Sequence, residues 1–153
     1  MEVITIVGSE RFVTTVELPA TVSPEERAVL DVYVDWLRVI AEFSDPWQVD
    51  HPRLASILTE TVHEKLVEGR LPKVRAGYFA TGEAQSRPIV AEISATRATV
   101  TDCRADTTTL FDGQGSVVSG PTPATEYDAA FVRGENGAWR LESWGPNGAP
   151  CES

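Results

Sequence analysis

The sequence offers few side chains for acid–base chemistry, and they lie on separate segments. A working site of this kind needs a buried carboxylate or histidine and a second group, such as a tyrosine, that holds developing negative charge. Asp102 alternates with apolar residues in ATVTDC, so it points into the core if that face is the buried one. We predict no complete catalytic constellation, and the weak candidates are Asp102, Tyr127, Tyr33 and His63.

Each candidate also has a plainer structural explanation, which occurs more often in proteins. Asp102 is then a carboxylate at a strand end that is solvated or accepts a backbone hydrogen bond. Tyr33 and Tyr127 are then core residues whose hydroxyls each find one partner. His63 is then an exposed residue early in a helix, and His51 a surface residue at a helix start.

No cofactor and no metal are predicted. The chain contains no Gly-x-Ser-x-Gly elbow, phosphate loop or dinucleotide fingerprint. Cys103, Cys151, His51 and His63 do not show the paired spacing of zinc ligands.

Composition and charge exclude several classes of protein. The 153 residues suit one domain with an ordinary core, and 13 basic residues against 23 acidic ones give a net charge of −10. The basic residues are scattered, so the sequence argues against binding to nucleic acid or to anionic membranes. No apolar run approaches the length of a membrane span, and the start MEVITIVGSERF lacks the features of a signal peptide.

Three helices are expected in the first half of the chain. The first begins at Ser23-Pro24, where Ser23 and Glu26 form a capping box, and ends at Ser44-Asp45-Pro46. Its broad apolar face consists of Val29, Tyr33, Trp36, Ile40 and Phe43.

The two helices that follow are expected to be shorter. Asp50 caps a segment that carries Leu54 and Ile57. Thr61 and Glu64 form a second capping box, and Gly69 is expected to end that helix.

From Lys73 onward the apolar pattern has a period of two, which predicts strands. The expected strands are 74–81, 88–95, 97–104, 107–112, 116–118, 125–133 and 138–144. Helices followed by an antiparallel meander predict an α+β fold with the helices packed on one face of the sheet.

The first twenty residues alternate like strands, with a turn at Gly8-Ser9-Glu10. We expect an N-terminal β arm or hairpin over 1–21, followed by a domain over 22–153. The arm could add a strand to the sheet of a partner. Its expected partner-binding residues are Val3, Ile4, Ile6, Phe12 and Val16.

The order of the elements resembles the nuclear-transport-factor-2-like fold, a cone of three helices on a strongly curved antiparallel sheet. A narrower resemblance rests on SPEERAVLDVYVDWLRVIAEFSDP, HPRLASILTETVHEKL, ATVTDC, AAFVRGENGAWRLESW and the cysteine near the chain end. These stretches look like a group of small exported or lipid-anchored actinobacterial proteins, over roughly residues 22–151. Where that group has a signal peptide and a linker, this chain has the 2–20 arm, so a phage-encoded relative is also considered.

The resemblance implies that Cys103 and Cys151 form a disulfide that ties the chain end to the sheet. Two separate reduced thiols are the alternative. A disulfide would place the working protein outside the reducing cytoplasm, whether secreted, at a cell surface or in a virion.

The resemblance to ketosteroid isomerases, dehydratases and polyketide cyclases implies a pocket between helices and sheet. Since no tight constellation accompanies it, we expect a non-catalytic binding or assembly module, either accessory or structural. It would recognise a protein partner, or a second copy of itself, through the curved sheet and the arm. A small apolar ligand is a further expected partner, and a small-molecule acid–base enzyme is the alternative function. Asp102 in a deep cavity, within reach of a Tyr or His, would favour catalysis, whereas a pocket filled by Trp and Phe would favour binding.

Overall fold

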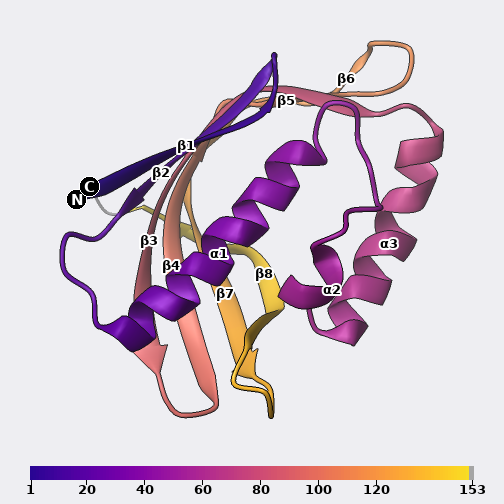
Figure 1. Ribbon diagram of the computed structural model, residues 1–153. Helices are drawn as coiled ribbons and strands as arrows, with labels where there is room; N and C mark the ends of the chain where they lie inside the picture. Colours follow the sequence, from indigo (N-terminus) through magenta and orange to yellow (C-terminus); the bar gives the residue numbers. More distant parts are fainter. Residues whose placement is uncertain (152–153) are drawn as a thin grey trace.

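The computed structural model describes residues 1–151. It has an N-terminal hairpin, then helices, then a sheet of eight strands in all, as Figure 1 shows. The elements are β1 (Glu2–Ser9), β2 (Phe12–Leu18), α1 (Pro24–Glu42), α2 (Leu54–Ile57), α3 (Glu60–Arg75), β3 (Phe79–Ile93), β4 (Arg97–Asp106), β5 (Thr109–Phe111), β6 (Val117–Ser119), β7 (Thr122–Arg133) and β8 (Trp139–Pro150). The predicted α+β class is confirmed.

Helix α1 forms as the sequence predicts. The Ser23 hydroxyl accepts from the Glu26 amide at 3.1 Å, and the Glu26 carboxylate accepts from the Ser23 amide at 3.0 Å. Both halves of the capping box are therefore present. The helix packs its apolar face against β1, β2, β3 and β8, which places Tyr33 and Trp36 in the core.

The sheet runs in the order β1-β2-β3-β4-β7-β8, and the short strands β5 and β6 extend from β3. All strand pairs drawn from the second half of the chain are antiparallel, as predicted. The expectation of a wholly antiparallel sheet is wrong at one place, because β2 runs parallel to β3. The helices between β2 and β3 return the chain to the starting end of the sheet, which is the connection that a parallel pair requires.

The sheet is also not strongly curled, in contrast to the expected cone. It is open at both ends, since β1 and β8 close no barrel. One sheet face must accommodate the whole of α1, which contacts strands at both ends of the order. A long helix laid across so many strands favours an open face over a tightly rolled one.

Several boundaries differ from the sequence prediction. Helix α2 begins after Arg53 and has no Asp50 cap. Helix α3 does not end at Gly69 but continues to Arg75, and it starts after Thr59 rather than at a Thr61–Glu64 capping box. A glycine inside a helix costs only about 1 kcal/mol relative to alanine, so contacts made beyond it can carry the helix onward. The expected strands 74–81 and 88–95 are accordingly replaced by the single strand β3.

The N-terminal hairpin belongs to the same core as the helices. Residues 12–16 of β2 pair with residues 82–86 of β3, so the arm joins a sheet edge of its own chain. Ile6, Phe12 and Val16 are at most 3% exposed, whereas Val3 is 53% exposed. The buried members of the expected partner-binding set therefore pack inside this chain.

Cys151 is fixed to β4, an interior strand of the sheet. Cys103 and Cys151 form a disulfide with Cα atoms 5.5 Å apart. The last strand, expected over 138–144, continues as β8 up to Pro150. An edge strand tolerates proline because one side of it needs no backbone donor. The Asn147 side chain adds hydrogen bonds to Glu126 and Asp128 on the neighbouring strand β7.

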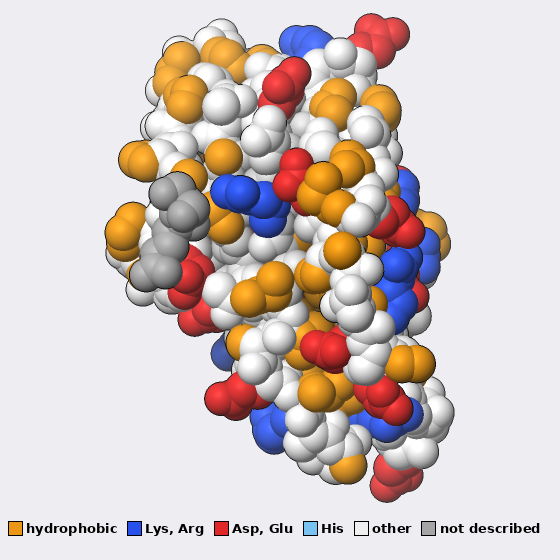
Figure 2. Space-filling model, turned by 90° about the vertical axis from the view of Figure 1, so that its left-hand side faces the viewer, with side chains coloured by type: hydrophobic (Ala, Val, Ile, Leu, Met, Phe, Trp, Pro, Cys, Tyr) orange, Lys and Arg blue, Asp and Glu red, His pale blue; other side chains and the backbone are white. Residues whose placement is uncertain are grey.

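Figure 2 shows the side of the molecule on which the hairpin and the two chain ends lie. Hydrophobic side chains there are scattered among acidic, basic and neutral polar groups and do not form one continuous patch. Within residues 1–151, no helix is long and apolar enough to cross a membrane.

Candidate ligand-binding site

A buried chain of hydrogen bonds joins three of the residues between α1 and the sheet. The Tyr33 hydroxyl donates to Asp102 Oδ2 at 2.6 Å, and the Trp144 indole N–H donates to the Tyr33 hydroxyl at 3.0 Å. The other carboxylate oxygen of Asp102 accepts from the Arg87 amide at 2.8 Å. The sequence candidates Asp102 and Tyr33 are therefore brought together by elements far apart in the chain.

The Asp102–Tyr33 pair is buried, whereas Trp144 is only partly buried. Asp102 and Tyr33 are both 0% exposed, and neither lines the cavity on the other side of Trp144. Burial raises the pKa of Asp102, although hydrogen bonds from Tyr33 and the charge of Arg104 act against it. Burial, together with the adjacent Asp102, also raises the pKa of Tyr33. Both side chains are therefore enclosed by the protein.

Asp102 is thus not the solvated strand-end carboxylate that its plainer explanation described. It lies in the interior of β4, and its side chain is fully buried. The part of that explanation that holds is the hydrogen bond from a backbone amide.

A cavity of about 240 Å³ lies on the other side of Trp144. It is bounded by the loop after α1, by α3, and by strands β3 to β8 of the sheet. The side chains that give it its chemical character are Trp47, Arg70, Arg104, Asp106, Tyr127 and Trp144. Arg70 and most of these aromatic side chains are only partly buried, so the cavity communicates with solvent.

Arg104 supplies a buried positive charge to this cavity. The residue is 3% exposed and its guanidinium donates to the Ser86 hydroxyl at 2.9 Å. The guanidinium carbon lies 5.7 Å from the Trp144 ring centre and 6.0 Å from that of Tyr127. Such distances are those of cation–π contacts. Because the two ring centres are only 5.1 Å apart, the guanidinium lies beside the ring pair and not between the rings.

Arg70 supplies the second charge, from α3. Its guanidinium lies 3.9 Å from the ring centre of Trp47 and donates to the backbone oxygens of Phe43 and Gln48. Burial lowers the pKa of Arg70 to about 10, so the group remains charged at neutral pH. The extension of α3 beyond Gly69 is what brings Arg70 to the cavity.

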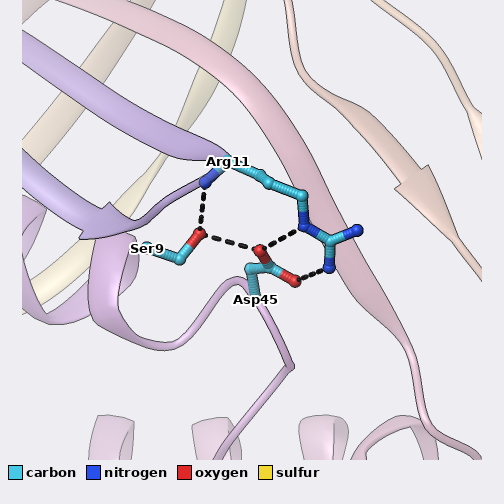
Figure 3. Close-up of polar contacts among 3 residues, drawn as sticks. All are labelled: Ser9, Arg11 and Asp45. Atoms are coloured by element: carbon cyan, nitrogen blue, oxygen red, sulfur yellow. Dashed lines mark hydrogen bonds and ion pairs between the residues drawn. The ribbon is translucent and has the colours of Figure 1, made fainter.

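A polar clamp fixes the loop that carries Trp47. As Figure 3 shows, Arg11 in the β1–β2 turn binds both oxygens of Asp45, at 3.0 and 2.6 Å, and the Ser9 hydroxyl donates to the same carboxylate at 2.7 Å. Burial alone would raise the pKa of Asp45, but the hydrogen bonds from Arg11 and Ser9 lower it. The N-terminal hairpin therefore positions one wall of the cavity.

The remaining sequence candidates lie apart from the buried pair. Tyr127 lines the cavity and lies against Trp144, with ring centres 5.1 Å apart. His63 lies on α3 outside the cavity lining, and His51 faces Glu42. Within residues 1–151, no three His, Cys, Asp or Glu side chains are grouped so that they could hold a metal ion.

The sequence reasoning did not single out Arg70 or Arg104. A signal for Arg104 was present, since it follows Asp102 by two residues and so shares its inward face. Arg70 carried no such signal, because the expected helix stopped one residue before it.

A second hollow, of about 300 Å³, lies beside the disulfide on the outer sheet face. Its lining includes Arg87, Glu17 and short polar side chains, and no aromatic residue. The cavity behind Trp144 is therefore the better candidate for ligand binding, because aromatic walls give both area and shape to a binding site.

In comparisons with known proteins, no family model and no curated protein matches this chain.

Proposed function

We propose that this protein is a non-catalytic binding module whose ligand site is the cavity walled by Trp47, Tyr127 and Trp144. One observation carries the proposal. The only hydrogen-bonded acid–phenol pair in the described residues, Asp102 with Tyr33, is sealed behind Trp144, whereas the cavity itself is lined by aromatic rings and arginines. Aromatic walls and fixed charges bind ligands, and arginine is not a proton-transfer group at neutral pH. The one carboxylate of the cavity lining, Asp106, accepts hydrogen bonds from the amide and the hydroxyl of Thr108 at its Oδ1.

The alternative, a small-molecule acid–base enzyme, would need Asp102 to exchange protons with a substrate. General acid–base catalysis requires the group within hydrogen-bond reach of the reacting atom, directly or through one water. Both oxygens of Asp102 are already occupied, by Tyr33 and by a backbone amide, and the side chain is fully buried. These contacts favour binding over catalysis.

A cavity-filling variant tests the proposed ligand site. Ser119 lines the cavity from the exposed strand β6, so Ser119→Trp places a large ring into it without altering the core. Val117 lies on the same strand, 64% exposed and outside the lining, so Val117→Trp is the matched control.

The measurement is a screen of small aromatic fragments by nuclear magnetic resonance, following the indole N–H signals of Trp47 and Trp144. Fragments that shift these signals in the native protein should lose their effect in Ser119→Trp and keep it in Val117→Trp. Equal binding to both variants, or no fragment that moves either signal, would reject the cavity as the ligand site.

Partner recognition is the second candidate, and the free edge of β1 favours it. β1 is the first strand of the order, so one side of it has no neighbour within residues 1–151, and Val3 and Val7 are 53% and 66% exposed. An unprotected edge can accept a strand from another chain, including a second copy. Val3→Lys/Val7→Lys should abolish any such assembly in sedimentation velocity, whereas Ile89→Lys, on β3 inside the sheet, should not.

The proposal also covers the compartment in which the protein works and the family that it resembles. A bridge between Cys103 and Cys151 is consistent with an oxidising setting, which supports a secreted, surface or virion protein. The resemblance to nuclear-transport-factor-2-like and exported actinobacterial proteins, or to a phage-encoded relative, fits helices packed on one sheet face.

A further inference from the structure

We propose that the cavity binds a small organic monoanion, a carboxylate attached to a flat apolar body. This inference rests on the proposed ligand site and adds the chemical class of its ligand. Arg104 and Arg70 would hold the carboxylate, and the rings of Trp47, Tyr127 and Trp144 would enclose the apolar body.

The first reason is that the positive charge of Arg104 is poorly compensated. No carboxylate of residues 1–151 forms an ion pair with its guanidinium, and its hydrogen-bond partner there is the neutral Ser86 hydroxyl. A guanidinium has five N–H donors in a planar fork that matches a carboxylate. A buried charge without a partner is costly, so an anion that reaches it gains a strong charge-assisted hydrogen bond.

Asp102 does not take that role. Asp102 precedes Arg104 by two residues and lies on the same face of β4. Its oxygens accept hydrogen bonds from the Tyr33 hydroxyl and the Arg87 amide. The charge of Arg104 lowers the pKa of Asp102, but the two side chains form no direct ion pair. The cavity side of Arg104 is therefore left for another acceptor.

The second reason is that Arg70 faces the same space with its charge already oriented. The backbone oxygens of Phe43 and Gln48 bind two of its nitrogens, and the Trp47 ring covers one of its flat sides. These contacts satisfy N–H donors of the Arg70 guanidinium, but none of the groups that make them carries a negative charge. As with Arg104, none of the ion pairs among residues 1–151 involves Arg70.

The third reason concerns the magnitude of the ligand charge. Asp106 is the one carboxylate among the cavity-lining side chains, and its Oδ1 is occupied by the amide and hydroxyl of Thr108. Two arginines and one aspartate leave one positive charge in excess at the cavity. The whole chain carries −10, so a multiply charged anion would be repelled at longer range. A single negative charge fits this balance.

The fourth reason concerns the rest of the ligand. A volume of about 240 Å³ accommodates one ring with short substituents and is below the usual range of drug-sized sites. The aromatic side chains in the lining favour a flat apolar body over a flexible polar one.

The test compares benzoate with benzamide, which have the same ring and nearly the same shape but differ by one charge. Both are titrated into the native protein while the indole N–H signals of Trp47 and Trp144 are followed. We expect benzoate to bind at least about tenfold more tightly, since a hydrogen bond to a charged group is roughly twice as strong as a neutral one. Acetate, which lacks the ring, should bind much more weakly than benzoate.

Variants then show which arginine binds the carboxylate of the ligand. Arg104→Met should abolish the preference for benzoate, and Arg70→Met should reduce it. Arg97→Met is the matched control, since Arg97 lies on the same strand, is exposed and pairs with Glu142 outside the cavity. If Arg104→Met does not fold, Arg70→Met and the benzoate–benzamide comparison still decide the question.

The outcomes separate the inference from the function on which it rests. Equal affinities for benzoate and benzamide, both lost in Ser119→Trp, would overturn the anion class and keep the ligand site. Benzoate binding that survives Arg70→Met and Arg104→Met unchanged would also overturn it. A cavity that binds neither compound and no other fragment would reject the ligand site itself.

Discussion

The hydroxyl of Tyr33 lies 2.6 Å from a carboxylate oxygen of Asp102, and this contact joins the middle of α1 to the interior of β4. The same hydroxyl accepts the indole N–H of Trp144 on β8. One oxygen atom therefore connects the helical layer to two strands of the sheet. Because Tyr33 and Asp102 are fully buried, removing the Tyr33 hydroxyl should be measurable as a loss of stability.

Tyr33→Phe is expected to destabilise the fold by about 1–3 kcal/mol, because it leaves a buried carboxylate oxygen and an indole N–H without a partner. Urea unfolding measures this difference. Tyr78→Phe is the matched control, since Tyr78 is only partly buried and none of its hydroxyl contacts belong to this network. A change in Tyr33→Phe no larger than that of the control would show that the network contributes little.

The pH dependence of Asp102 follows from the direction of its pKa shift. Its folded pKa is raised above the unfolded value, so its contribution to stability is fully present below the unfolded value, near pH 4, and is lost as pH rises through the folded pKa. Asp102→Asn removes this titration and retains an acceptor for the Arg87 amide. The stability of the native protein relative to Asp102→Asn should thus fall between acidic and neutral pH.

Unfolding curves of both proteins, recorded at several pH values from 4 to 8, test this expectation. A difference between the two proteins that stays constant over this range would contradict a raised pKa. Any catalytic activity that Asp102→Asn reduced by about a hundredfold or more would restore the acid–base enzyme as the leading hypothesis.

The clamp between Arg11 and Asp45 should show the opposite pH dependence. The pKa of Asp45 is lowered, so its contribution is present above the unfolded value and is lost as pH falls through the folded pKa. Asp45→Asn should be less stable than the native protein at neutral pH, and the two should converge in acid. Because the clamp holds the loop of Trp47, the variant should also weaken fragment binding in the cavity. Asp31→Asn, which removes an exposed ion pair on α1, is the control for a simple loss of charge.

The N-terminal hairpin offers a matched pair of substitutions within one strand. Ile6→Ala should cost about 2–5 kcal/mol, because Ile6 is 1% exposed in the core. Val3→Ala, at 53% exposure, should change stability by no more than about 0.5 kcal/mol. Similar effects at the two positions would mean that the hairpin does not pack on α1.

The disulfide should be detectable by mass spectrometry of the unreduced protein, and its loss by unfolding. The bridge closes a loop with a sequence separation of 48, which corresponds to at most about 4 kcal/mol on the chain-entropy argument. Cys103→Ser, Cys151→Ser and the double variant should lose the same stability, since either change breaks the one bond. Two free thiols in the native protein would reject the bridge and the oxidising compartment that it supports.

The sequence was most informative where local signals agree with the tertiary structure. The Ser23–Glu26 box and the apolar stripe of α1 are local, and alternation identified β4 and β7. The parallel pairing of β2 with β3 carries no local signal, because it depends on where the helices return the chain. The cavity was missed for the same reason, since Arg70 on α3 and Arg104 on β4 line one cavity only in the folded chain.

The pairing of β2 with β3 also constrains the order in which the protein can fold. Residues 12–16 can pair with β3 only after residues 82–86 have been made, and all three helices lie between the two segments. Contacts between segments so distant in the chain form slowly, whereas the β3-β4 and β7-β8 pairs close over short turns. During synthesis the hairpin is made before β3, so Ile6, Phe12 and Val16 stay exposed until β3 has been made. The hairpin that holds the cavity wall in the finished protein is thus the segment most in need of protection during synthesis.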